Sequence, residues 1–351
     1  MKPISQVPLP ALVATAVSLC GCTKQSAGDS RQEGPIRGRA SDPPVELKAA
    51  WKPGNRYLLL LESRQSSEGG GRGPGPGRQE TTTAQELAVT VSEAARGSVK
   101  LDVEIQSLAV DAFFGDQLVL HFDSLNKAGP NDGPGTEMLE QLVGGKFQVL
   151  IKPDNTIARG DGLRELTDRA AAAGGGATGR RGGLGMGMAQ RLFDMNSLRQ
   201  VLELTGYPTK PVRIGDQWPQ ERSLPAGMMG TLVLKATNTF RGWQELDRRK
   251  CARIDFTGAM ASAGDARGGG RGGGPMNLED VRAEGRTWFD ATLGFPVETE
   301  LRLQGNLVGN RPPGPRGGPN APAAQAGAGG ARVSRPMEQT FTVKLKQLEA
   351  M

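Results

Sequence analysis

The feature that most constrains the fold is a series of segments in which apolar and polar residues alternate, separated by stretches rich in glycine and proline. In one of them, Val99, Leu101, Val103 and Ile105 share one side of an extended chain, and charged residues occupy the other side. Similar alternation recurs in residues 58–62, 81–91, 118–122, 146–152, 230–242, 251–259, 282–290, 296–306 and 337–348. A period of two places every second side chain on the same face of a strand, so the sequence predicts a mainly β fold (α+β) with antiparallel strands.

Short turn sequences join several of these segments. Pro53-Gly54-Asn55, Ala95-Arg96-Gly97, Gly115-Asp116 and Pro153-Asp154-Asn155 each combine residues that favour tight turns. Turns this short connect neighbouring strands in hairpins, which again indicates an antiparallel sheet.

The middle of the chain has a different periodicity. Leu163, Leu166 and Ala170 recur at helical spacing. A second apolar stripe with the same spacing ends before Gly206 and Pro208 and consists of Met188, Leu192, Met195, Leu198 and Leu202. We therefore expect about two helices here. A stripe that contains methionine is compatible with a ligand groove, although ordinary core packing is the more common role.

Two segments of the chain look alike. Residues 52–57 and 213–218 each contain a basic residue, a turn with glycine and an aromatic residue that opens a strand. We interpret the likeness as a duplicated β unit, residues 45–159 and 209–348, joined by a helical bridge at 160–208. Unrelated hairpins that use the same turn residues explain the likeness equally well. Duplicated units of this kind often close into a single curved sheet.

Glycine and proline account for 51 and 24 of the 351 residues. They are concentrated in residues 69–78, 174–183, 264–275 and 309–336. We predict that these four stretches are disordered loops, because they offer little apolar surface to bury. They contain ten arginines and a single acidic residue, whereas the net charge of the whole chain is only +6. The positive charge therefore belongs to loops rather than to one folded face, and we expect no nucleic-acid partner.

The amino-terminal residues have the order of an export signal. A lone lysine precedes an apolar run at residues 11–19, which is shorter than the about 20 residues of a membrane-spanning helix. Leu19-Cys20-Gly21-Cys22 resembles the lipobox of bacterial lipoproteins. The resemblance implies a signal peptide at 1–21, cleavage after Gly21, and acyl chains such as palmitate on Cys22.

Such an anchor would determine where the protein is found. Two or more acyl chains hold a protein stably on a membrane, whereas one chain does so only marginally. Thr23 is not acidic, which favours the outer membrane under the sorting rule known for some bacteria. We predict a lipid-anchored protein of the bacterial cell envelope, on the periplasmic or surface face. Residues 22–44 are polar and are predicted to form a flexible tether, followed by a β-rich domain at 45–348.

One motif supports a likeness to a known family. Gly215-Asp216-Gln217-Trp218 is a Gly-Asp-x-Trp turn, and it resembles a turn in a family of exported bacterial proteins that carry a domain of unknown function. Residues 47–57, 250–256 and 287–297 fit the same family, so the likeness covers most of 45–348. The resemblance implies a β-rich exported protein. It supplies no activity and no catalytic residues.

The chain is poor in residues that build catalytic and metal centres. His121 is the only histidine, and Cys251 is the only cysteine beyond the proposed signal and anchor, which excludes ordinary zinc or copper centres. We expect Cys251 to be a small core residue and His121 to be a strand residue with one polar partner. Asp102, Glu104 and Asp123 leave a carboxylate-dependent hydrolase as a third interpretation.

Two other interpretations of function are better supported. The first is an envelope lipoprotein that binds an apolar ligand or a protein partner without catalysis, and it predicts a concave apolar pocket of several hundred Å³, a size common for ligand sites. The second is a structural or assembly scaffold of the cell envelope, in which the helical stripe packs against a filled sheet face. We favour the first, and we expect neither enzymatic activity nor a cofactor.

Overall fold

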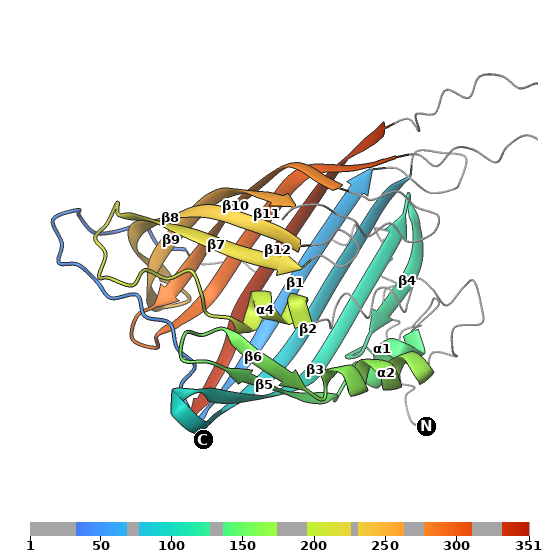
Figure 1. Ribbon diagram of the computed structural model, residues 1–351, viewed down its shortest axis with the longest axis horizontal. Coiled ribbons are helices and arrows are strands. Elements are labelled where there is room, and N and C mark those ends of the chain that lie inside the picture. The colour runs from blue at the N-terminus through green and yellow to red at the C-terminus, as the bar shows by residue number, and fades with distance from the viewer. Residues whose placement is uncertain are drawn as a thin grey trace, which may run out of the picture.

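The computed structural model describes residues 33–68, 77–126, 136–173, 195–225, 231–262, 277–310 and 332–350. The predicted signal peptide, Gly21 and Cys22 lie outside the described residues. The twelve strands in the described segments belong to one antiparallel sheet, which is curved and stays open between its two edges (Figure 1). The prediction of a mainly β fold with a curved antiparallel sheet is confirmed.

The strands form two groups along the chain. The first group is β1 (Asn55–Glu68), β2 (Arg78–Glu93), β3 (Val99–Phe114), β4 (Gln117–Asp123), β5 (Lys146–Ile151) and β6 (Ile157–Asp161). The second group is β7 (Gln217–Pro225), β8 (Thr231–Leu246), β9 (Arg249–Ser262), β10 (Asn277–Asp290), β11 (Phe295–Asn310) and β12 (Arg332–Ala350). The described α-helices are α1 (Thr136–Leu142), α2 (Leu163–Ala173) and α4 (Met195–Leu202).

The chain enters and leaves the sheet at its centre. The strand order is β6-β5-β3-β2-β1-β12-β11-β10-β9-β8-β7, and β4 pairs with β3 outside this row. β1 therefore pairs with β12, while β6 and β7 are the two edges. The connection from one edge to the other passes through α2 and α4. The two predicted β units are thus parts of one continuous sheet.

The two turns that suggested a duplication have similar backbones. Gly54 has a φ of 80° and Gly215 has a φ of 93°. Each lies three residues before an aromatic side chain, Tyr57 or Trp218, near the start of a strand. The positive φ explains why glycine occupies both positions. The duplication itself stays a prediction.

The concave face of the sheet is apolar, as the alternation predicted. Tyr57, Leu59 and Leu61 alternate along β1, and each is at most 3 % exposed. Leu101 and Ile105 on β3 are fully buried. The helices add further apolar side chains to the same core, namely Met138, Leu139 and Leu142 from α1 and Leu163, Leu166 and Ala170 from α2.

The helices match the expectations only in part. α2 covers the segment in which Leu163, Leu166 and Ala170 predicted a helix. α4 contains Leu198 and Leu202 of the second stripe, whereas Met188 and Leu192 lie outside the described residues. α1 is an additional helix. It has only seven residues, which is too few for a periodic pattern to stand out.

Two of the four predicted loops are shorter than expected. Arg78 already begins β2, and residues 309–336 supply the end of β11 and the start of β12. Gly309 pairs with Val333, and so the ladder extends into the glycine-rich sequence. Pairing of strands uses backbone groups, which a glycine or arginine offers as well as a valine does. Gly77 is described and precedes β2, and the other predicted loop residues, including all of 174–183 and 264–275, lie outside the described part of the chain.

Residues 33–37 pair with β8 through isolated bridges, although residues 22–44 were predicted to form the tether. The amide of Gly34 donates to the carbonyl of Glu245 at 2.9 Å, and Trp243 donates to the carbonyl of Arg37 at 2.8 Å. Gly242 permits this approach, because a Cβ at that position would lie 2.7 Å from the carbonyl oxygen of Arg37. Residues that precede position 45 therefore already contact the sheet, and the domain bounds stay a prediction.

Candidate ligand-binding site

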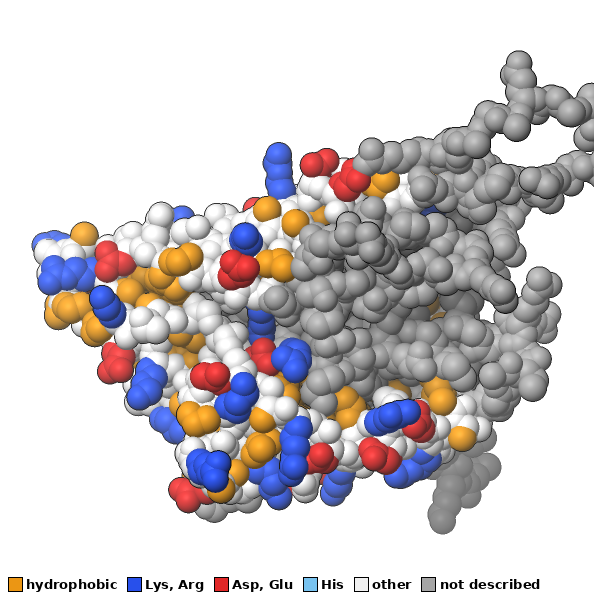
Figure 2. Space-filling view, in the orientation of Figure 1, with side chains coloured by type: hydrophobic (Ala, Val, Ile, Leu, Met, Phe, Trp, Pro, Cys, Tyr) orange, Lys and Arg blue, Asp and Glu red, His pale blue; other side chains and the backbone are white. Residues whose placement is uncertain are grey.

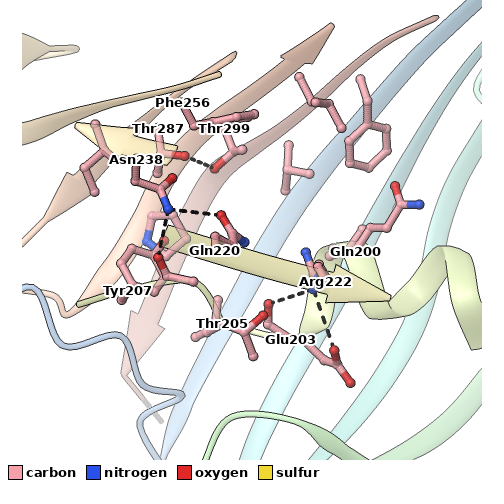
Figure 3. Close-up of a pocket in the computed structure, with 18 of the residues that line it drawn as sticks. Gln200, Glu203, Thr205, Tyr207, Gln220, Arg222, Asn238, Phe256, Thr287 and Thr299 are labelled. Carbon is pink, nitrogen blue, oxygen red and sulfur yellow. Dashed lines mark hydrogen bonds and ion pairs between the residues drawn. The ribbon is translucent and has the colours of Figure 1, made fainter. Parts of the chain in front are cut away.

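A cavity of about 130 Å³ lies between the concave face of the sheet and the residues that leave α4 (Figure 3). Its sheet side is formed by apolar residues of the four strands β1, β12, β11 and β9, namely Leu59, Ile254, Phe256, Leu301, Phe341 and Val343. Val201, Leu204 and Tyr207 contribute from the α4 side. The cavity is smaller than the several hundred Å³ that the first interpretation predicted.

The apolar surface continues beyond the cavity along the same sheet face. Leu234 lines the cavity and also belongs to a second buried cluster, together with Met260, Val281, Leu303 and Met337. Part of this surface depends on glycine. A Cβ at Gly285 would overlap the ring of Phe256, so the absence of a side chain lets that ring contact the neighbouring strand β10 closely.

Indole groups fix the α4 side of the cavity in place. Nε1 of Trp51 donates to the carbonyl oxygen of Leu202 at 2.9 Å, and Nε1 of Trp218 donates to that of Gly206 at 2.8 Å. Both bonds satisfy carbonyl groups at or beyond the end of α4, where the helix leaves them without partners. The wall is therefore held by Trp51, 151 residues before its partner, and by Trp218, 12 residues after its partner.

One end of the cavity is charged. Nη2 of Arg222, on β7, donates to the carbonyl oxygens of Arg199 at 2.6 Å and Glu203 at 3.3 Å, and it lies 3.7 Å from Oε2 of Glu203. Nη1 of Arg199 lies 3.1 Å from Oε1 of Glu203. The same Oε1 accepts a hydrogen bond from the amide of Ile157 on the opposite sheet edge. Residues from β6, α4 and β7 therefore meet at this end.

Burial changes the properties of two groups there. It lowers the pKa of the Arg222 guanidinium, an effect that the nearby Glu203 opposes. Burial also raises the pKa of the Tyr207 phenol far above its usual range, so this hydroxyl is neutral at any physiological pH. Nε of Arg222 is buried and has no hydrogen-bond partner among the described residues.

A second polar group lies further along the cavity (Figure 3). Nδ2 of Asn238 donates to Oε1 of Gln220 at 3.3 Å and to the carbonyl of Gly206 at 3.5 Å. The hydroxyls of Thr287 and Thr299 share a hydrogen bond of 3.2 Å. These side chains are uncharged, so the charge of the cavity is confined to the end that contains Arg222.

The carboxylates considered for hydrolysis do not converge. Asp102 pairs with Lys100 and Glu104 with Lys146 on the outer side of β3, both partly exposed. Asp123 lies opposite Ala109, seven residues further along β3 than Asp102, or about 23 Å at about 3.3 Å per residue. Catalytic carboxylates of glycosidases are about 5–9.5 Å apart. Asp123 is therefore too far from Asp102 for such a pair, whereas Asp102 and Glu104 lie two residues apart on the partly exposed outer side of β3, each beside a lysine. The hydrolase interpretation stays a prediction.

The remaining sequence candidates have structural roles. Nδ1 of His121 on β4 lies 2.6 Å from Oδ1 of Asp111, so the expected single polar partner is confirmed. Cys251 on β9 is fully buried against Leu246 and Trp288, as expected for a core residue. Within the described segments, no cluster of three or more His, Cys, Asp and Glu side chains could hold a metal ion.

The sequence did not single out the residues of the cavity. The one usable signal is Asn238, which interrupts an otherwise apolar row on β8 formed by Leu234, Ala236 and Phe240. Arg222 gives no such signal, because its position beside Glu203 depends on how the helical bridge crosses the sheet.

The surface shown in Figure 2 carries both signs of charge. Basic and acidic side chains are interspersed over its described part, and neither kind gathers into a patch on this face.

Among the described helices, none combines the length and the apolar character needed to cross a membrane.

Comparisons with known proteins give one family match. Residues 96–267, just under half of the chain, match a family described as "Family of unknown function (DUF6263)". This agrees with the expected likeness to a family of unknown function, and the matched range includes the turn at 215–218. A comparison with curated proteins gives no match.

Solved structures give only distant likenesses. One, titled "Lipid-protein interactions in lipovitellin", has a TM-score of 0.49 and 11% identity and covers 86% of this chain; the chain spans only 26% of that protein. A putative outer membrane lipoprotein-sorting protein domain from Vibrio parahaemolyticus has a TM-score of 0.15 and 7% identity, covering 83% and 84% of the two chains. An outer membrane channel from Pseudomonas putida F1 has a TM-score of 0.16 and 8% identity, covering 86% and 99%. At these scores the likenesses assign no function.

Proposed function

We propose that this protein is a lipid-anchored protein of the bacterial cell envelope that binds a small apolar ligand, or the end of an acyl chain, without catalysis. The observation that carries the proposal is the cavity of about 130 Å³ between the second group of strands and α4. Leu301, Phe341 and Phe256 give it an apolar sheet side. The anchor rests on Cys22 and the lipobox-like residues before it.

The volume limits what can bind. An apolar cavity of about 150 Å³ holds a molecule the size of benzene. A cavity of about 130 Å³ therefore suits an apolar group of about six carbons. Its α4 wall is already held by Trp51 and Trp218, and most ligand sites are similarly preformed.

The binding experiment uses the full chain and 1-hexanol as an uncharged probe of this size. Isothermal titration calorimetry is expected to show saturable binding, and saturating 1-hexanol is expected to raise the melting temperature, because a ligand that binds only the native state stabilises it. Two substitutions fill the cavity from opposite sides, Leu301→Trp and Val201→Phe, and both are expected to abolish binding.

The matched control is Arg302→Trp. Arg302 is the next residue on β11, its side chain is on the other face of the sheet, and it pairs with Glu338. This variant is expected to bind 1-hexanol as the unchanged protein does. Failure of the unchanged protein to bind, or equal binding by the folded Leu301→Trp, Val201→Phe and Arg302→Trp variants, would contradict the proposal.

A scaffold function is the second candidate, and the small volume of the cavity favours it. Leu198 and Leu202 of α4 are buried, and the concave face of the first group of strands is filled by α1 and α2. Native mass spectrometry of the protein extracted from its own envelope separates the two functions. A bound small molecule supports the ligand-binding function, whereas a protein complex without a small molecule supports the scaffold.

A further inference from the structure

The last residues of β8 pair with a segment that belongs to neither group of strands. β7 pairs with β8 only as far as Thr239, and residues 243–246 of β8 pair instead with residues 33–37. The amide of Arg37 donates to the carbonyl oxygen of Trp243, whose own amide donates back to Arg37 at 2.8 Å. Bonds of this kind join backbone groups only, so another extended peptide can form them at the same edge.

A group of donors that bind a carboxylate lies beside this edge. Nη1 of Arg253 on β9 and Nη1 of Arg286 on β10 lie 3.8 and 3.9 Å from the two carboxylate oxygens of Glu33. Nε2 of Gln244 on β8 donates to the same carboxylate at 3.4 Å and to the carbonyl oxygen of Gly34 at 2.8 Å. Donors from three neighbouring strands therefore converge on one acidic side chain.

The sheet holds the two guanidinium groups in place without Glu33. Nε of Arg253 donates to Oδ1 of Asp255 at 2.8 Å, and Nε of Arg286 lies 3.0 Å from Oε2 of Glu300. Each arginine thus uses one side of its guanidinium on a sheet carboxylate and presents Nη1 to Glu33. Ion pairs of this kind fix the direction of the donors as well as their charge.

A buried tryptophan forms the floor beneath these donors. Trp288 is fully buried, and its Nε1 donates to Oε1 of Gln244 at 2.8 Å. The guanidinium carbons of Arg253 and Arg286 each lie 5.5 Å from the centroid of its ring. All four side chains belong to strands of the sheet, so the group is preformed, as most binding sites are.

The segment that occupies the edge has sequence features that the edge requires. A side chain at position 34 would place its Cβ 3.2 Å from Cβ of Glu245, closer than an ordinary contact, so glycine fits there. Glu33 supplies the carboxylate just before it. The side chain of Ile36 is 47 % exposed, so the edge selects little at that position. The fit therefore depends on an acidic residue followed by glycine.

We propose that the end of β8 is a docking site for an extended peptide in which glutamate precedes glycine, and that the chain's own residues 33–37 close this site. A peptide of this kind displaces residues 33–37 and adds a strand at the same edge. Its carboxylate pairs with Arg253 and Arg286, as that of Glu33 does in the closed form. The inference is independent of the proposed cavity ligand, because Ile254 lines the cavity and the side chain of Arg253, one residue earlier, is on the other face of the sheet.

The experiment measures binding of a fluorescein-labelled peptide of residues 31–39 to the full chain by fluorescence anisotropy. The unchanged chain is expected to bind the peptide weakly, because its own segment competes at an effective concentration of about millimolar. Glu33→Lys places a like charge beside the two guanidinium groups and is expected to tighten peptide binding at least about ten-fold. Glu33→Gln is expected to give a smaller gain. Faster amide hydrogen exchange at Arg37 and Trp243 is expected in both variants.

Two altered peptides test the recognised sequence. Glutamine in place of the glutamate is expected to weaken binding to the Glu33→Lys chain several-fold, because the charge that pairs with the guanidinium groups is gone. Valine in place of the following glycine is expected to abolish binding, because its side chain meets Glu245. Equal binding of the glutamine peptide and the unaltered peptide overturns the inference.

A disulfide that holds the segment closed is the matched control. Gly34→Cys and Glu245→Cys bring two Cβ atoms to about 3.2 Å, close to the about 3.5–4.5 Å of disulfides. They are introduced into the Glu33→Lys chain, in which Cys20→Ser and Cys22→Ser remove competing thiols. The oxidised chain is expected not to bind the peptide, and reduction is expected to restore binding, a switch that misfolding cannot produce. Peptide binding by the oxidised chain, or no gain in a Glu33→Lys chain with unchanged circular dichroism, overturns the inference.

Discussion

The indole nitrogen of Trp51 donates a hydrogen bond to the carbonyl oxygen of Leu202, 2.9 Å away and 151 positions later in the sequence. Trp51 precedes the central strand of the sheet, and Leu202 ends the helix that covers the cavity. The bond therefore joins the centre of the sheet to the crossing between its two edges. The ring of Trp51 also contacts Tyr57 and Phe295 edge-on, with centroids 5.0 Å apart in both pairs.

Trp51→Phe should loosen α4 without emptying the core. The substitution keeps an aromatic ring and removes the indole donor, and a buried carbonyl that loses its partner costs about 1–3 kcal/mol. We expect a loss of stability of this size in urea unfolding and faster amide hydrogen exchange in α4 than in β2. Unchanged exchange in α4 would show that the helix does not depend on this bond.

Gly285 and Gly54 should respond differently to alanine. A Cβ at Gly285 would overlap the Phe256 ring and the carbonyl oxygen of Glu300, whereas the space around Gly54 is open. Gly54→Ala therefore introduces only the strain of a positive φ, about 1 kcal/mol. Gly285→Ala is expected to lower the free energy of unfolding in urea by more than about 2 kcal/mol, because either the neighbouring strand β11 or the Phe256 ring must shift. Equal losses in the two variants would contradict the close packing at Gly285.

The Cys251 thiol should be unreactive in the folded protein. Burial, with a smaller contribution from Asp290, raises the pKa of this thiol to about 12. A thiol in an unfolded chain has a pKa of about 8.5. Native protein at pH 9 is expected to resist iodoacetamide at Cys251, and protein in urea is expected to react, as read from the mass of the peptide that contains it. Rapid labelling of the native protein would contradict the burial of this group.

The same shift predicts a dependence of stability on pH. Because the folded state holds the thiol proton more tightly, the contribution of Cys251 is fully present below pH 8.5 and is lost as the pH rises toward 12. Cys251→Ala should flatten this part of the stability profile. If the free energy of unfolding fell equally between pH 8.5 and 12 in Cys251→Ala and in the unchanged protein, groups other than Cys251 would cause the loss of stability.

The proposed anchor is tested by two serine substitutions. Cys22→Ser should release the protein from membranes or leave an unprocessed precursor, because the acylated side chain is missing. Cys20→Ser, two residues earlier, should leave the membrane fractionation and the mass of the mature protein unchanged, because residue 20 is removed with the signal peptide. A Cys22→Ser variant that still fractionates as a lipidated protein would disprove the assignment.

The sheet was predictable because its side chains follow a simple local rule. The alternation of Leu101, Val103 and Ile105 identified both the strand β3 and its buried face. The sequence Ala95-Arg96-Gly97 likewise predicted a turn, and Arg96 and Gly97 both have positive φ values there. In each case the residues that decide the structure are close together in the sequence.

The cavity was not predictable for the opposite reason. Arg222 belongs to a polar stretch of an edge strand, and Glu203 follows a helix, so neither stands out on its own. They meet because the chain crosses from β6 to β7 over the concave face. The contact between residues 33–37 and β8 was not predictable for a related reason, since backbone groups make it and the side chains give no signal.

The contacts of Glu33, Gly34 and Arg37 with β8 bear on the reach of the proposed lipid anchor. If Cys22 carries the lipid, residues 22–32 join the lipid to the first residue that contacts β8. Eleven residues span at most about 40 Å when fully extended, and a free segment of 22–44 would span about twice that. The molecule is then confined to a thin layer of periplasm or surface next to one leaflet. Whatever enters its cavity must come from that layer or from the leaflet itself.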